Sequence, residues 1–164
     1  MGLTSLAFGG ALLAVLVAIA MVDFRSLTIP DALNALLAAL GLASAWLSAG
    51  AFPLAATVFA ACLLAGFWLV RATFRLARGV TGLGLGDVKM AGAAGFWFSP
   101  WNVPAFLFFS AISALLFVAA SRSVTGRLDR EARVPFGPFL GFGLFATWLL
   151  ERSGLPTFIP EGGY

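Results

Sequence analysis

The sequence contains no histidine and one cysteine, Cys62. Without histidine the chain cannot form a Ser-His-Asp triad, a Cys-His pair or a His-ligated metal site. A single cysteine allows neither an intrachain disulfide nor a thiolate metal cluster. Cys62 lies in an apolar run, so we expect a small core or lipid-facing residue. Carboxylates, hydroxyls and the only lysine, Lys89, remain as the main groups for catalysis.

Charged residues are scarce as well. They make up 10% of the 164 residues, whereas 61% are hydrophobic. Soluble domains contain about 25% charged and about 45–50% apolar residues. The composition therefore predicts an integral membrane protein in contact with the lipid bilayer. The length suits one compact helical bundle over residues 1–164, with no separate soluble domain.

Apolar runs close to the length that crosses a bilayer recur along the chain, separated by turns and charged loops. We predict an all-α polytopic fold of about six transmembrane helices. The first five lie near residues 3–22, 32–47, 54–70, 87–98 and 104–120, and the sixth follows the segment 134–138 and ends near 150. The polar tail, 151–164, is expected to be loose.

The basic residues predict the orientation of the bundle. Six spans place three loops on one side, and these loops hold every basic residue except Arg152. The positive-inside rule assigns that side to the cytoplasm and both termini to the other side of the inner membrane. In the last of these loops, acidic and basic residues alternate, which indicates a neutralised surface loop. Its charged residues are Arg122, Arg127, Asp129, Arg130, Glu131 and Arg133.

Three aspartates fall at the predicted cytoplasmic edge: Asp23, Asp31 and Asp87. Asp23 ends the first span and Asp87 begins the fourth, and helices that cross in opposite senses can bring such ends together. Two adjacent carboxylates share one proton, which is the arrangement that aspartic peptide hydrolysis needs. Asp87 can also be the N-cap of a helix starting at Val88, and Asp31 can stabilise the start of the second helix.

The stretch before Asp87 has glycine at every second position: Gly82, Gly84 and Gly86. Glycine lets a backbone or a substrate approach closely. Lys89 follows, and no serine stands near it in the sequence, so a headgroup or carboxylate partner is favoured over a Ser-Lys hydrolase.

The segment Gly84-Leu85-Gly86-Asp87-Val88-Lys89 resembles the motif of the GxGD membrane aspartyl proteases. Two further blocks narrow the resemblance to the prepilin peptidases, or type IV leader peptidases. These blocks are Asp23 ahead of Ile29-Pro30, and Pro135-Phe136-Gly137-Pro138-Phe139 at the start of the last span. The similarity covers nearly the whole chain.

The resemblance implies that Asp23 and Asp87 are the catalytic pair of an endopeptidase at the cytoplasmic face. Its substrates would be prepilin or pseudopilin proteins with a short basic leader, cut before a hydrophobic helix, commonly after glycine. The residues expected to bind substrate are Gly84, Gly86, Lys89, Pro135, Phe136 and Gly137. No metal, cofactor or nucleic-acid partner is expected.

The chain departs from the family in two ways. The family often has asparagine after Ile-Pro, where this chain has Asp31. Longer members carry a cysteine-rich insert after the first span and also N-methylate the mature pilin, whereas here few residues separate the first two spans. The chain therefore resembles the short branch that serves Flp-type or tight-adherence pili, and methyltransferase activity is not implied.

Two other functions fit a polytopic protein with paired aspartates. One is a transporter that passes cations or protons along such residues. The other is a noncatalytic assembly protein of the pilus machinery. The sequence leaves open the particular prepilin, the oligomeric state and the separation of Asp23 and Asp87.

Overall fold

The computed structural model describes residues 2–80, 82–125 and 135–153. This part of the chain contains helices and no strand, which confirms the all-α prediction. The predicted charged loop lies mostly outside the described residues, as does the tail beyond Ser153. The helices are α1 (Leu3–Ser26), α2 (Asp31–Ala49), α3 (Leu54–Arg78), α4 (Leu85–Ala94), the 3-10 helix η1 (Pro100–Asn102), α5 (Val103–Thr125) and α6 (Gly137–Arg152).

Within the described part of the chain, four helical segments are long and apolar enough to cross a membrane: α1, α2, α3 and Pro100–Ser121, which covers η1 and most of α5. The chain is therefore a multi-pass membrane protein. Helices α4 and α6 have 10 and 16 residues, fewer than the roughly 20 that a perpendicular span needs. Each lies against longer helices and completes the bundle without reaching full span length.

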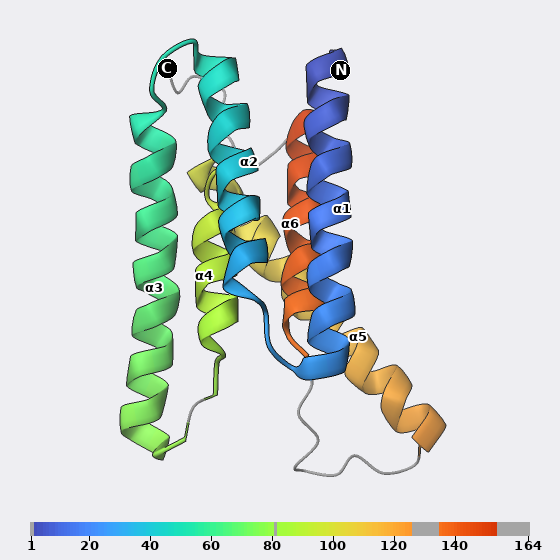
Figure 1. The fold of residues 1–164 in the computed structure, drawn as a ribbon. Helices are drawn as coiled ribbons and strands as arrows, with labels where there is room; N and C mark the ends of the chain where they lie inside the picture. Colours follow the sequence, from blue (N-terminus) through green and yellow to red (C-terminus); the bar gives the residue numbers. More distant parts are fainter. Residues whose placement is uncertain (1, 81, 126–134, 154–164) are drawn as a thin grey trace.

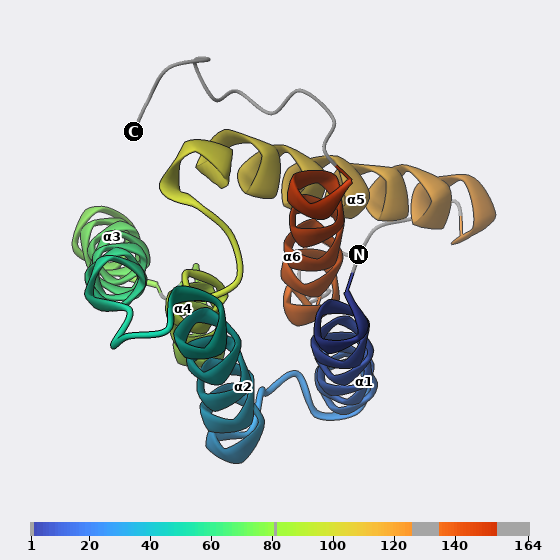
Figure 2. The same cartoon turned by 90° about the horizontal axis from the view of Figure 1, so that it is seen from above.

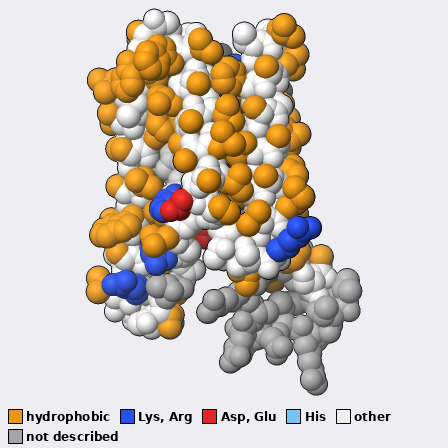
Figure 3. All heavy atoms as spheres, viewed as in Figure 1, with side chains coloured by type: hydrophobic (Ala, Val, Ile, Leu, Met, Phe, Trp, Pro, Cys, Tyr) orange, Lys and Arg blue, Asp and Glu red, His pale blue; other side chains and the backbone are white. Residues whose placement is uncertain are grey.

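Helices α1, α2, α3, α4 and α6 run up and down, and α5 crosses them at a slant (Figures 1 and 2). Helix α4 lies between α2 and α3, and α6 lies between α1 and α5. The α1–α2 and α3–α4 connections lie at the lower end in Figure 1, where α6 also begins. Most Lys and Arg side chains on the visible face lie in the lower half of the molecule (Figure 3). The two aspartate-bearing helix ends therefore meet at the same end of the bundle.

Several helix boundaries differ from the sequence-based expectation, because α1, α3 and α5 extend further and α4 begins and ends earlier, and two of these differences bear on the aspartates. Helix α3 continues to Arg78 and stops at Gly79, whose φ of 70° is the left-handed geometry that glycine adopts without strain. Helix α4 begins at Leu85, so Asp87 is its third residue. The N-cap interpretation of Asp87 is therefore wrong, because Gly84 occupies that position.

Helix α4 is the most enclosed element, and glycines let α3 approach it. A Cβ on Gly95 would lie 2.6 Å from the Cα of Ala60, and a Cβ on Gly92 would lie 2.9 Å from the Cβ of Leu64. Such contacts leave no room for a side chain, as expected for helix packing in membranes. The close packing fixes α4, and with it Asp87, against α3.

The tightest glycine contact joins α5 and α6, and it generates a stability prediction. A Cβ on Gly143 would lie 2.0 Å from Ser110 Oγ and 2.8 Å from the carbonyl oxygen of Phe106. Gly143→Ala should therefore overpack this contact and lower the free energy of unfolding by about 1–3 kcal/mol, which corresponds to an unfolding temperature in detergent lower by roughly 2–10 °C. The control is Gly10→Ala, since a Cβ on Gly10 meets nothing within 4 Å. Equal unfolding temperatures for the two variants would contradict this packing.

Candidate active site

Asp23 lies in the last turn of α1 and is buried, with 4% of its surface exposed. Its Oδ2 accepts a hydrogen bond of 2.9 Å from the backbone N–H of Gly137, the first residue of α6. A Cβ on Gly137 would lie 2.9 Å from that same oxygen and 3.0 Å from Cδ1 of Ile29. Glycine at 137 therefore lets the start of α6 reach the carboxylate.

Asp87 has a matching environment at the start of α4. The backbone N–H of Gly84, the N-cap residue, hydrogen-bonds the Asp87 carboxylate. A Cβ on Gly84 would lie 2.8 Å from Asp87 Oδ2. Both aspartates thus accept a hydrogen bond from a glycine N–H at a helix N-terminus, where backbone donors are free and the helix dipole favours negative charge.

One cleft of about 980 Å³ brings the two aspartates together. The glycine stretch contributes Gly82, Leu83 and Gly84, and the segment before α6 contributes Pro135 and Phe136. The remaining wall comes mainly from α3. Of the predicted site residues, the catalytic pair, Gly84, Pro135 and Phe136 line this cleft, whereas Gly86, Gly137 and Lys89 do not.

The cleft alters the titration of Asp87, which lies outside the four candidate spans. Burial raises the pKa of Asp87 to about 6, and the negative charge of Asp23 adds to the rise. The Gly84 hydrogen bond acts in the opposite direction and lowers the pKa. A carboxyl group with a pKa near 6 can hold a proton at mildly acidic pH, as a general acid must.

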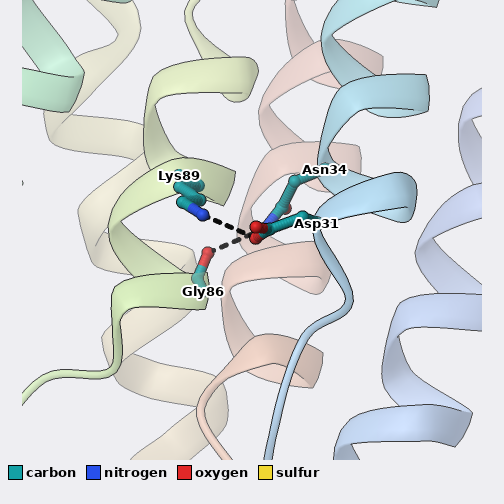
Figure 4. Close-up of polar contacts among 4 residues, drawn as sticks. All are labelled: Asp31, Asn34, Gly86 and Lys89. Carbon is teal, nitrogen blue, oxygen red and sulfur yellow. Dashed lines mark hydrogen bonds and ion pairs between the residues drawn. The ribbon is translucent and has the colours of Figure 1, made fainter.

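Gly86 is held from the side of α2. Its carbonyl oxygen accepts a hydrogen bond of 3.1 Å from Nδ2 of Asn34 (Figure 4). A Cβ on Gly86 would lie 2.9 Å from Cβ of Ile29. Ile29, just before α2, and Asn34 within it therefore pack against Gly86 at the start of α4, and Gly86 has a packing role.

Lys89 forms an ion pair with Asp31, with 2.6 Å between Nζ and Oδ1 (Figure 4). The pair confirms the carboxylate partner expected for Lys89. It is well exposed, so it contributes at most about 1 kcal/mol to stability. Asp31 is the first residue of α2 and makes no side-chain capping hydrogen bond. Its carboxylate interacts favourably with the dipole of α2 and forms the ion pair with Lys89.

Arg71 is a site residue that sequence reasoning missed. It lies on α3, lines the cleft and donates a hydrogen bond from Nη1 to the carbonyl oxygen of Leu83. Arg71 and Asn34 thus hold the glycine stretch from two different helices. One signal in the sequence could have identified Arg71. Of the three arginines of α3 it is the nearest to the apolar run, four residues before Arg75 and seven before Arg78.

Among the described residues, no group of three or more His, Cys, Asp or Glu side chains is placed to hold a metal ion. The cleft therefore presents two carboxyl groups, one guanidinium group and backbone donors. This set can activate water and protonate an oxygen or nitrogen, which is general acid–base chemistry.

The described part of the chain is thus a multi-pass helical membrane protein with two aspartates in one cleft. The comparison with known families is more specific. Residues 10–119 match the type IV leader peptidase family, and the chain belongs to that family.

Curated relatives agree with this assignment. A prepilin leader peptidase/N-methyltransferase of Burkholderia pseudomallei is 35% identical over 164 residues, which cover 96% of this chain and 49% of that protein. The corresponding protein of Neisseria gonorrhoeae is 32% identical over 143 residues, covering 85% of this chain and 47% of the relative. Leader peptidase HopD of Salmonella typhimurium is 33% identical over 97 residues, covering 59% of each chain.

The chain thus spans about half the length of the prepilin leader peptidase/N-methyltransferases that it matches. No solved structure gives a significant match.

The environment of Asp87 predicts a specific dependence of stability on pH. Because the folded-state pKa lies above the ordinary value of 3.8, the folded protein binds this proton more tightly than the unfolded chain. Its contribution to stability is therefore present below about pH 4 and is lost as the pH rises through about 6. Asp87→Asn, which stays neutral, should unfold at a higher temperature than the wild type at pH 8, with the difference shrinking toward pH 4.

The control for this measurement is Asp31→Asn, which removes an exposed carboxylate and its ion pair and should give no such gain. An Asp87→Asn protein no more stable than the wild type at pH 8 would show that Asp87 is not desolvated as described.

Proposed function

We propose that the protein is a membrane aspartic endopeptidase that removes the short basic leader from type IV prepilin-like substrates. The observation that carries this proposal is the shared cleft of Asp23 and Asp87, which lie on different helices and 64 residues apart in the sequence. Membership of the type IV leader peptidase family supports the same chemistry. Relatives named as prepilin leader peptidases support the substrate class.

In this mechanism the two carboxyl groups hold one proton between them. The ionised group takes a proton from water as the water oxygen attacks the scissile carbonyl carbon. The protonated group donates to the carbonyl oxygen, giving a tetrahedral intermediate. The C–N bond then breaks as the nitrogen receives a proton, which releases the leader with a new carboxyl terminus and the mature protein with a new amino terminus.

The surrounding residues divide into two groups in this proposal. Gly84, Pro135 and Phe136 line the cleft and are assigned to substrate contact. Gly86 and Gly137 contact Ile29 and Asp23 respectively, so we assign them to positioning the site. Lys89 belongs to neither group, because its exposed ion pair with Asp31 lies outside the cleft.

We place the cleft at the cytoplasmic face of the inner membrane, with the N-terminus on the other side. The support is the distribution of charge on the described residues. The end of the bundle that holds the cleft also carries most of the described basic side chains, namely Arg25, Arg71, Arg75, Arg78 and Lys89. Such an excess of Lys and Arg is typical of cytoplasmic loops.

The direct test is cleavage of a purified prepilin in detergent, followed by mass analysis of the product. Asp23→Asn and Asp87→Asn should each reduce the rate by at least about 10²–10⁴-fold, because each removes one acid–base group. Asp31→Asn, an exposed aspartate outside the cleft, is the matched control and should keep most of the activity. An intact substrate with folded wild-type protein, together with ion flux that depends on the two aspartates, would instead support a transporter.

Arg71 provides a second prediction, because its hydrogen bond to Leu83 holds the backbone next to Gly84. Arg71→Ala should lower kcat by about 10–100-fold through misplacement of Asp87, with a smaller change in KM. Arg71→Lys, which can still donate to the carbonyl, should recover part of this loss. Arg75→Ala, one turn along the same helix and exposed, is the control. Equal kcat values for Arg71→Ala and Arg75→Ala would refute the positioning role.

A further inference from the structure

The cleft extends beyond the aspartates along one face of α3. Its α3 wall contains Cys62, Leu63, Gly66, Phe67, Val70 and Phe74, with Arg71 beside them. The spacing of three or four residues places them on a single helix face. From residue 62 to residue 74 the face is about 18 Å long at 1.5 Å per residue. Because α3 is a candidate span, most of this face lies within the membrane.

The polarity of the cleft changes along its length. Its charged lining residues are Asp23, Asp87 and Arg71, and Arg71 contacts the glycine stretch near the end of α3. Toward Cys62 the α3 wall is apolar, and Leu107 of α5 adds another apolar residue to the lining. A polypeptide whose scissile bond lies at the aspartates therefore meets an apolar surface on one side only.

We propose that this face of α3 is the binding site for the apolar segment of the substrate that follows the cut bond. This inference rests on the proposed peptidase function. The segment runs from the aspartates along α3, while the polar leader leaves at the basic end of the bundle. The cleft volume of about 980 Å³ is close to that of about two turns of an α-helix about 10 Å wide, roughly 850 Å³.

Gly66 is the position at which this site can be narrowed. It lines the cleft, and a Cβ there would meet no atom within 4 Å. The protein's own packing therefore tolerates a larger side chain, and leucine is also the better helix former. The open space at Gly66 is available to a substrate side chain, so Gly66 becomes a specificity-determining residue.

The first test compares Gly66→Leu with Gly10→Leu. Gly10 is an equally open glycine on α1 that does not line the cleft. With a full-length prepilin in detergent, Gly66→Leu should raise KM by at least about 10-fold with a smaller effect on kcat, and Gly10→Leu should match the wild type. Alanine in place of the large residues in the substrate's apolar segment should restore cleavage by Gly66→Leu. Unchanged KM in Gly66→Leu would overturn the proposal.

The second test uses Cys62, the only cysteine of the chain, as a probe within the cleft. In an Asp87→Asn background that retains substrate, single cysteines are placed along a prepilin and disulfide formation with Cys62 is measured. Cross-links should form from the apolar segment and not from the leader. Cross-links from the leader alone, or none at all, would contradict the proposal. They would indicate that lipid acyl chains cover this face of α3.

The two tests separate this inference from the function on which it rests. If Asp23→Asn and Asp87→Asn still cleave the prepilin, the proposed function fails. If both are inactive while Gly66→Leu has normal KM or Cys62 does not cross-link to the apolar segment, the inference fails alone.

Discussion

Two carboxyl groups must be held in a largely apolar cleft, and this constraint organises the structure. Each is held in the same way, by the backbone N–H of a glycine at the start of a helix: Gly137 for Asp23 and Gly84 for Asp87. In both cases a Cβ on the glycine would lie within 3 Å of a carboxylate oxygen. The donors are backbone groups that a helix start leaves free, so no extra polar side chain is buried.

The rest of the bundle keeps these two helix starts in place. Helix α4 is pressed against α3 at Gly92 and Gly95, and α2 holds it through the Asn34 hydrogen bond to Gly86. Arg71 fixes the preceding loop from α3. Because the long helices α2 and α3 and the shorter α6 pack on α4, this short helix holds the Asp87 carboxyl group at a defined position. Rigid positioning of this kind is what acid–base catalysis by a pair requires.

Composition and the apolar runs predicted the helical class and about six transmembrane helices, and four of the six described α-helices have the length of a span. The opposite crossing senses of the first and fourth helices predicted that Asp23 and Asp87 can lie at one end of the bundle. The sequence did not predict that α4 begins at Leu85. Gly84 is the N-cap, and packing of α4 against α3, which helps to fix this start, cannot be read from the local sequence. It also missed Arg71 and Asn34, whose partners are backbone carbonyls distant in the sequence. Such contacts depend on tertiary placement and leave no local pattern of residues.

Direct titration tests whether Asp23 and Asp87 form one coupled pair. The chain has four aspartates, so selective ¹³C labelling of aspartate carboxyl groups gives four signals that Asp→Asn variants assign. We predict that Asp87 titrates with a pKa near 6 and that Asp23→Asn lowers this pKa, because a neighbouring negative charge is lost. An Asp87 pKa near 3.8, unchanged by Asp23→Asn, would contradict the pair.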